Sequence, residues 1–442
     1  MPASEELARE LSSRLRRTQR DERVPSVVAA VGRRGETLLE EGVGLADVEA
    51  GRDATPDTQY RVGSITKTFT AVAVVQLRDG GLVGLDDCVG DHIPEAAHPG
   101  PTIRRMLSHS SGLQREPAGD LWETMETPTV DELLGRLDEA EQVLEPGRWW
   151  HYSNLAFCLL GEVVARRAGM PYRAWVQERI LDPLGLSRTT WDPADPRAQG
   201  YMVEPYSDSV RRELDDLDLK GADAAGQLWS TTGDLLRWGG FFCDPDESVL
   251  SRSSVEDMHA LEVMTDEHWH QGWGLGLALT REGERILGGH SGGMPGHISC
   301  FAHSRSDGWV ATALTNGAAD MEPLAHGLLT AVADALPDLP EAWRTGDAPP
   351  DEVAGILGRW WSEGQEFVFS WRDGRLTACG VFTPADAPPA VFAPDGNDRW
   401  RVESGRERGE LLRVVRAADG EVEKLYWATY PFRRKPFTFG ER

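Results

Sequence analysis

A serine and a lysine three residues apart, Ser64 and Lys67, are the first residues in this sequence whose types and spacing could do chemistry. A short β-prone run (residues 60–62) precedes them, and apolar residues then recur at helical spacing up to Leu77. Ser64 is therefore expected at the start of a helix, with the lysine amine one turn along the same face. A hydroxyl within reach of an amine in this way pairs a nucleophile with a base.

The choice of lysine at this position is informative because the sequence otherwise avoids lysine. Only Lys67, Lys220, Lys424 and Lys435 occur, and every other basic residue is arginine. Arginine does not lose its proton at accessible pH, whereas a desolvated lysine can act as a general base. The N–H groups at a helix start also favour a developing oxyanion beside the serine. The pattern predicts acyl transfer through Ser64.

Two further motifs follow in order, Tyr152-Ser153-Asn154 and His290-Ser291-Gly292. Together with Ser-x-x-Lys they resemble the three-motif signature of serine β-lactamases and penicillin-binding proteins, in the class C and carboxypeptidase/esterase branch. The resemblance covers roughly residues 25–335. It implies an antiparallel sheet flanked by helices, together with an all-helical lobe.

The resemblance also implies roles for the motif residues. Tyr152 would shuttle protons between the serine, the lysine and the leaving group, while Asn154 would hydrogen-bond Lys67 and the substrate amide. The oxyanion hole would be the N–H groups of Ser64 and Gly293.

His290 stands where many members of the family have lysine. A histidine titrates near pH 6.5 and can donate a hydrogen bond or a proton without a permanent charge. Tight binding of a free substrate carboxylate is therefore not expected, and an ester, thioester or internal amide suits the motif better.

Other residues are candidates for contact with the substrate. Arg433-Arg434-Lys435 is the only run of three basic residues, and one arginine could hold a substrate carboxylate in a bidentate pair if the C-terminal region folds back over the cleft. A solvated tail is the alternative. The further candidates are Ser291, Gly292 and Trp229.

Composition excludes several function classes. The 442-residue chain has a formal net charge of −26, which argues against nucleic acid and anionic membranes, because both are bound through clustered positive charge. The charged first 23 residues contain no apolar signal region and no run is long enough to span a bilayer, so we expect a cytoplasmic protein. Five scattered cysteines lack metal-ligand spacing, so neither a metal nor a cofactor is predicted.

Periodicity then places the elements. The helical spacing of Leu7, Leu11 and Leu15 predicts an amphipathic N-terminal helix, and residues 27–31 and 37–41 predict a hairpin. Residues 102–240 are mainly helical in pattern, with Thr102 capping a first helix that would end at Gly112. Strand-like runs return over residues 273–315, and residues 324–336 predict a closing helix.

A boundary is expected where prolines and acidic residues gather, so we predict a catalytic domain over residues 1–340 and a linker over 341–350. Short alternating runs separated by Asp-Gly turns follow over residues 351–442 and predict a small all-β domain. It resembles the lipocalin-like β-barrels appended to some proteins of this family. The overall fold class is thus α/β (α+β) followed by an all-β barrel.

Three functions are compatible with these observations. The favoured one is a thioesterase of the penicillin-binding-protein type that releases a nonribosomal peptide from a peptidyl carrier protein and cyclises it by macrolactamisation. The alternative is a cytoplasmic esterase or D-amino-acid-specific peptidase that hydrolyses small acyl substrates. The third is a catalytically silent ligand-binding or sensor module.

Overall fold

The chain separates into two compact units, Met1–Asp338 and Leu339–Arg442, and each is described by itself. The structure is a computed structural model that describes residues 5–214, 217–338, 342–384 and 387–438. The predicted domain end at residue 340 and the first linker residue, 341, lie outside the described residues.

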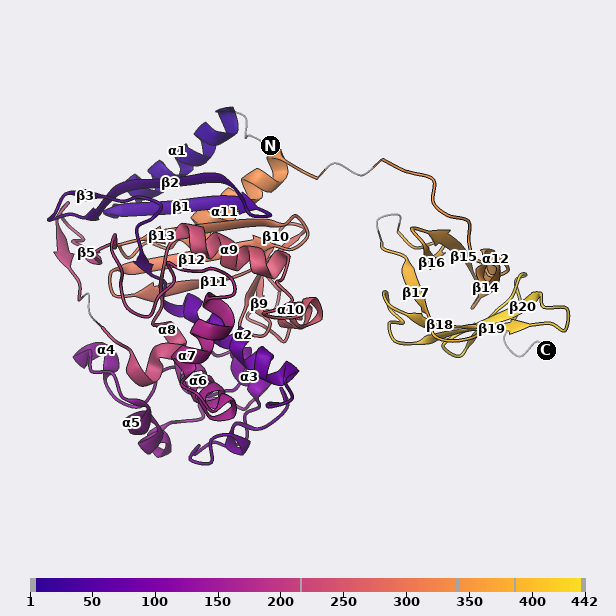
Figure 1. The fold of residues 1–442 in the computed structure, drawn as a ribbon, viewed down its shortest axis with the longest axis horizontal. Helices are drawn as coiled ribbons and strands as arrows, with labels where there is room; N and C mark the ends of the chain where they lie inside the picture. The colour runs from indigo at the N-terminus through magenta and orange to yellow at the C-terminus, as the bar shows by residue number, and fades with distance from the viewer. Residues whose placement is uncertain (1–4, 215–216, 339–341, 385–386, 439–442) are drawn as a thin grey trace. The chain divides into compact units, whose positions relative to one another are not determined.

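A nine-stranded antiparallel sheet forms the centre of the first unit, with the strand order β3-β2-β1-β13-β12-β11-β10-β9-β8 (Figure 1). Its first hairpin joins β1 and β2, as the sequence predicts, and β1 also pairs with β13 from the far end of the unit. The strands are β1 (Ser26–Arg33), β2 (Glu36–Asp47), β3 (Arg52–Asp53), β8 (Val263–Met264), β9 (Gln271–Trp273), β10 (Ala278–Glu282), β11 (Arg285–Met294), β12 (His297–Ser304) and β13 (Trp309–Thr315).

Two helices cover one face of this sheet. The N-terminal helix α1 (Glu5–Asp21) buries Leu7, Leu11 and Leu15, which confirms the amphipathic pattern. It shares an apolar cluster with the closing helix α11 (Glu322–Ala335) and with side chains of β1, β12 and β13. The central strands are therefore buried on both faces, which explains why β13 is apolar or small throughout rather than alternating.

The opposite face packs against the nucleophile helix α2 (Thr66–Asp79), α9 (Thr232–Cys243) and the helical lobe. The lobe contains α3 (Ile103–Leu107), α4 (Leu121–Thr124), α5 (Val130–Gly135), α6 (Asn154–Ala168) and α7 (Tyr172–Val176). None of the helices in the described ranges is long and apolar enough to cross a membrane.

The first helix of the lobe, α3, starts as predicted but ends early. Thr102 caps it by accepting a hydrogen bond from the Arg105 N–H at 3.3 Å. The predicted end at Gly112 is wrong, because His109 already has a left-handed backbone with φ +54°. Gly112 lies in the following loop, where an added Cβ would stand 2.0 Å from the Leu144 carbonyl oxygen.

One half of β11 is a free edge. Its ladder with β10 runs from Glu282 opposite Arg285 to Ala278 opposite Gly289. Among the described strands, residues 290–294 pair only with β12. The third motif therefore lies on a strand edge that β10 leaves unpaired, where an extended substrate can add its own hydrogen bonds.

The second unit is a nearly closed antiparallel barrel of eight strands in sequence order, which confirms the predicted all-β fold. A bridge between Trp361 and Arg433 brings the last strand back to the first. After the short helix α12 (Asp351–Ala354), the strands are β14 (Gly358–Ser362), β15 (Gln365–Arg372), β16 (Arg375–Gly380), β17 (Ala390–Pro394), β18 (Arg399–Val402), β19 (Leu411–Arg416), β20 (Val422–Trp427) and β21 (Tyr430–Phe432).

Candidate active site

Ser64 lies on a single 3₁₀ turn, η1 (Gly63–Ile65), directly before α2. The α-helix begins two residues later than the serine, because the Thr66 hydroxyl donates to the Gly63 carbonyl at 2.7 Å and closes the tight turn first. Gly63 has φ +50°, and an added Cβ there would stand 2.8 Å from the Gly293 nitrogen. A glycine is needed at this point for the nucleophile turn to approach strand β11 closely.

Lys67 reaches back to the serine as its spacing predicts. Its Nζ donates to Ser64 Oγ at 3.0 Å and to the Ala225 carbonyl oxygen at 2.6 Å. The side chain is completely buried. Burial lowers the pKa of Lys67 to about 7, which Glu116 partly opposes by favouring the charged form. A large fraction of the amine is thus neutral near pH 7 and able to accept the serine proton.

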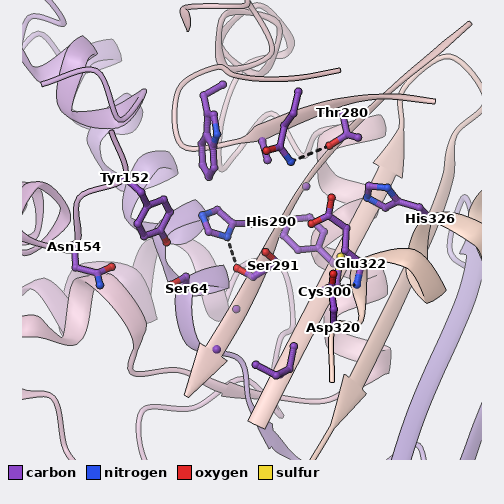
Figure 2. Close-up of a pocket in the computed structure, with 18 of the residues that line it drawn as sticks. Ser64, Tyr152, Asn154, Thr280, His290, Ser291, Cys300, Asp320, Glu322 and His326 are labelled. Carbon is purple, nitrogen blue, oxygen red and sulfur yellow. Dashed lines mark hydrogen bonds between the residues drawn. The ribbon is translucent and has the colours of Figure 1, made fainter. Parts of the chain in front are cut away.

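The Tyr152 ring lies beside Ser64 (Figure 2). Burial raises the pKa of Tyr152 well above its ordinary value, and a hydrogen bond with the Ser64 side chain opposes part of this rise. The ring stacks on His109 with centroids 4.1 Å apart, and Lys67 Nζ lies 5.0 Å from the ring centroid. The hydroxyl is therefore held in place, keeps its proton, and can donate it next to the nucleophile.

Asn154 corrects one expectation. Its Nδ2 donates to Glu116 Oε1 at 2.7 Å, and its Oδ1 is buried without a hydrogen-bond partner among the described residues. The predicted bond to Lys67 is absent, because Oδ1 is the only side-chain atom that could accept from the amine and it does not. Glu116 turns the amide around so that the carbonyl oxygen stays free.

His290 is a neutral histidine. Its Nδ1 lies 2.5 Å from the Ser291 carbonyl oxygen, while Nε2 is buried without a partner in the described chain. Burial, and then the charge of Lys67, lower the pKa of His290 to about 3. A carbonyl oxygen only accepts, so Nδ1 must carry the proton and Nε2 is a bare acceptor. In this tautomer the donor group of the ring is Nδ1–H, which the Ser291 carbonyl oxygen occupies, and the buried Nε2 is an acceptor.

The two glycines after Ser291 allow the strand to lie against the nucleophile turn. A Cβ on Gly292 would stand 1.9 Å from the Val62 carbonyl oxygen and 2.7 Å from Ser299 Oγ. The Gly293 backbone adjoins Gly63, next to Ser64. The Gly293 N–H group therefore lies close to the nucleophile turn, and its pairing with the Ser64 N–H group as an oxyanion hole stays a prediction.

A cleft of about 800 Å³ joins these groups and continues away from them. Ser64, Tyr152 and Asn154 line one arm, whereas Asp320, Glu322 and His326 line the other (Figure 2). Between the arms the wall is the third motif and its neighbours on β11, including Ser291, Gly292 and Gly293. Lys67 lies behind the serine and does not line the cleft.

Of three further residues predicted to bind substrate, one belongs to the core of the first unit and two belong to the barrel. Trp229 is only 1% exposed and packs against Arg61 and His297 in the core, so it is a structural residue. Arg434 donates to the carbonyl oxygens of residues 355, 357 and 359 and stacks on Trp360, which fixes it within the barrel. The Arg433 backbone pairs with Trp361, and its role in substrate binding stays a prediction.

Other lining residues were not found from the sequence. Trp150 and Trp273 stack with centroids 6.0 Å apart beside Tyr152, and both line the cleft. Trp150 lies two residues before the second motif, so its place in the sequence was the available signal. Glu116 and Glu322 carry no such signal, because only the folded chain brings them to the cleft.

The first unit combines an antiparallel sheet with helices on both faces, and its site places a serine one helical turn from a buried lysine. A tyrosine and a glycine-rich edge strand lie beside this pair. These features define the class of β-lactamase-like proteins. The chain belongs to the family described as Beta-lactamase, whose model matches residues 11–334. Residues 349–434 match a second model, described as Domain of unknown function (DUF7586).

Individual relatives show how wide this family is. Esterase EstB of Burkholderia gladioli is 35% identical over 46% of this chain and 55% of its own length. The structure of D-amino acid amidase from Ochrobactrum anthropi SV3 with D-phenylalanine is 26% identical, covers 74% of this chain and 98% of that chain, and has a TM-score of 0.63. The octameric penicillin-binding protein homologue from Pyrococcus abyssi covers 96% of this chain and 99% of that chain with a TM-score of 0.66, but at 22% identity it shows the fold alone. The chain spans between about half and two thirds of the first curated relatives that it matches.

Proposed function

We propose that the protein is a serine hydrolase that cleaves small esters and amides through an acyl-Ser64 intermediate. The observation that carries this proposal is the 3.0 Å contact between Nζ of the fully buried Lys67 and Oγ of Ser64, which lines the cleft. The contact joins the nucleophile to an amine whose pKa is about 7. The similarity to an esterase and to a D-amino acid amidase supports ester or amide bonds as the target.

The first half-reaction follows from these positions. Lys67 takes the Ser64 proton, Oγ forms a bond to the substrate carbonyl carbon, and the oxyanion receives the Ser64 and Gly293 N–H groups. Collapse of this intermediate breaks the bond to the leaving group. Tyr152 donates its proton to the departing oxygen or nitrogen and is reprotonated from the Lys67 ammonium.

Water completes the second half-reaction. The Lys67 amine, neutral again, accepts a proton from a water that attacks the acyl carbon, and Ser64 leaves with a proton returned through Lys67 or Tyr152. Asn154 and His290 line the cleft on which Ser64 opens and limit the space for its acyl group.

The volume of the cleft supports a second candidate, the peptide-cyclising thioesterase. A cleft of about 800 Å³ with two arms is larger than a short ester requires and has room for a folded-back peptidyl chain. In that reaction an amine at the far end of the chain replaces water. A carrier protein as partner and a cytoplasmic location stay predictions.

The test uses the purified full chain and its Ser64→Ala variant with 4-nitrophenyl butyrate and with a peptidyl thioester ending in a D-residue. We expect an acyl adduct on wild type only, seen by intact-protein mass, and turnover of the ester to the acid. A thioester product one water lighter than the linear acid would identify the cyclase instead. Turnover that survives in Ser64→Ala would refute both.

A further inference from the structure

The loop that follows α3 is bonded directly to the second motif. Ser153 Oγ donates to the Gln114 carbonyl oxygen at 2.7 Å, and the Asn154 N–H group donates to the Arg115 carbonyl oxygen at 2.6 Å. Gln114 Nε2 in turn donates to the Glu116 carbonyl oxygen at 2.8 Å. These bonds fix the backbone of the loop at the start of α6. The two charged side chains of the loop therefore project from a fixed place beside the catalytic groups.

The Glu116 carboxylate has a partner on each side. Its Oε1 accepts a hydrogen bond from Asn154 Nδ2 at 2.7 Å and lies 3.7 Å from Nε of Arg115. The Glu116 side chain is 27% exposed, whereas the Arg115 side chain is 65% exposed. Water therefore screens the carboxylate less than the guanidinium, and the cleft wall keeps a negative charge at this point.

The Arg115 guanidinium and the Lys67 amine lie near the same aromatic ring. The guanidinium carbon of Arg115 is 5.1 Å from the centroid of the Tyr152 ring, and Lys67 Nζ is 5.0 Å from the same centroid. The two cationic groups are thus separated by about 10 Å at most. Because Lys67 is completely buried, repulsion at this distance is incompletely screened and disfavours the ammonium form of the lysine.

Among the described groups around Lys67, this loop supplies the charges. Burial is the largest cause of the lowered pKa of Lys67, while the Glu116 carboxylate favours its charged form and Arg115 disfavours it. The other titratable groups that face the amine are uncharged near pH 7, because burial raises the pKa of the thiol and the phenol and lowers the pKa of the imidazoles. They are Cys158 on α6, Tyr152, His109 and His290. Asp223, at the start of α8 (Asp223–Gly226), pairs with Arg173 at 2.8 Å.

We propose that Glu116 and Arg115 are positioning residues whose opposed charges set the pH range in which Lys67 serves as the base. Glu116 favours the ammonium group that Lys67 becomes when it takes the serine proton, and it also holds the Asn154 amide in place. Arg115 opposes the ammonium group, which keeps the free amine available near neutral pH. The inference rests on the proposed hydrolase function and adds the residues that set its pH range.

The test follows kcat/KM for 4-nitrophenyl butyrate from pH 5 to pH 9 in the purified full chain, with Ser64→Ala as the background. Glu116→Gln keeps an oxygen that can accept from Asn154 but removes the charge. The midpoint of its profile should fall by about 0.5 pH unit, the size expected for one unit charge roughly 10 Å away at a dielectric constant between those of protein and water. Arg115→Gln should raise the midpoint by a smaller amount, because the guanidinium is exposed and screened. The double variant should lie between the two.

Two controls separate the charge from other effects of substitution. Glu139→Gln removes a carboxylate from an exposed ion pair of the same lobe, the 2.7 Å contact with Arg136, and should keep the wild-type midpoint. Glu116→Asp keeps the charge but is one methylene too short to reach the Asn154 amide. Its midpoint should stay close to that of wild type, while kcat/KM on the plateau falls about tenfold through the lost hydrogen bond. A midpoint does not depend on the amount of folded enzyme, so partial unfolding of a variant does not hide the result.

The two proposals fail in different ways. Midpoints that stay at the wild-type value in both Glu116→Gln and Arg115→Gln, or that shift in the same direction, would overturn the role of the charge pair while leaving the hydrolase intact. A midpoint shift in Glu116→Asp as large as that in Glu116→Gln would also refute it, because the aspartate keeps the charge. Absence of Ser64-dependent turnover in wild type at every pH would overturn the hydrolase and the inference that rests on it.

Discussion

Replacing the buried lysine should change how the stability of the catalytic unit depends on pH. In Lys67→Met the side chain keeps its length but cannot bind a proton. In wild type the pKa of Lys67 is about 7 in the folded chain, against 10.5 for an ordinary lysine. Between these values the unfolded chain holds a proton that the folded chain has lost, so the free energy of unfolding of wild type rises with pH.

The magnitude follows from this difference. Each pKa unit corresponds to about 1.36 kcal/mol, so the free energy of unfolding of wild type relative to Lys67→Met should rise by about 2.7 kcal/mol between pH 6 and pH 9. The rise should be shallow below pH 7, where both states hold the proton. Loss of the bond to the Ala225 carbonyl shifts the variant by a constant amount at all pH values and leaves the slope unchanged.

Urea unfolding of the full chain at a series of pH values measures this slope, followed by a signal assigned to the catalytic unit. Lys220→Met is the matched control, because this residue is exposed in the same unit. The control loses a hydrogen bond from Nζ to the Thr127 carbonyl oxygen, so its curve should run parallel to that of wild type. Parallel curves for wild type and Lys67→Met would mean that Lys67 stays protonated up to pH 9. The argument that it is the base for Ser64 would then be refuted.

Three further predictions concern activity and the barrel. The kcat/KM for an uncharged ester should rise with pH to a plateau, with a midpoint near pH 7, as Lys67 loses its proton. Because the pKa of Tyr152 is raised, loss of the Tyr152 proton should cause no fall in kcat/KM below about pH 10. A flat profile from pH 5 to 9 would contradict this prediction. Gly292→Ala should lower kcat/KM at least about 100-fold, because its Cβ would stand 1.9 Å from the Val62 carbonyl oxygen and push the strand from the nucleophile turn. Ser291→Ala is the control at the neighbouring position: the Ser291 side chain is exposed, so this variant should retain activity on the same ester. Arg434→Met should lower the free energy of unfolding of the barrel by about 1–2 kcal/mol, because the guanidinium loses its hydrogen bonds to backbone carbonyl oxygens. Calorimetry of the full chain measures this change. An unchanged barrel transition would argue against a structural role for Arg434.

Much of the fold could be predicted from the sequence because it depends on local periodicity. The spacing of the N-terminal leucines, the first hairpin and the Asp-Gly turns of the barrel each determine an element by short-range chemistry. The contact between the serine and the lysine is also determined locally, since the two residues are one helical turn apart. The motif order further indicated which distant segments meet at the cleft.

What could not be predicted depends on partners far along the chain. The direction of the Asn154 amide is set by Glu116, which lies 38 residues earlier and has no distinguishing sequence context. Trp229 was a candidate for contact with the substrate, yet the fold turns its ring into the core against His297. The tautomer of His290 depends on a single backbone carbonyl, and no composition or spacing reports that contact.

The nucleophile turn approaches the edge strand closely, and this contact separates motif positions that must stay fixed from positions that can be varied to change the substrate range. Gly63 and Gly292 have no room for a side chain, so randomising them would fill a library with unfolded or inactive clones. His290, Ser291 and Trp150 line the cleft without occupying that contact. Diversity placed at these three positions would alter which acyl groups are accepted while the serine, its base and the oxyanion donors stay in register.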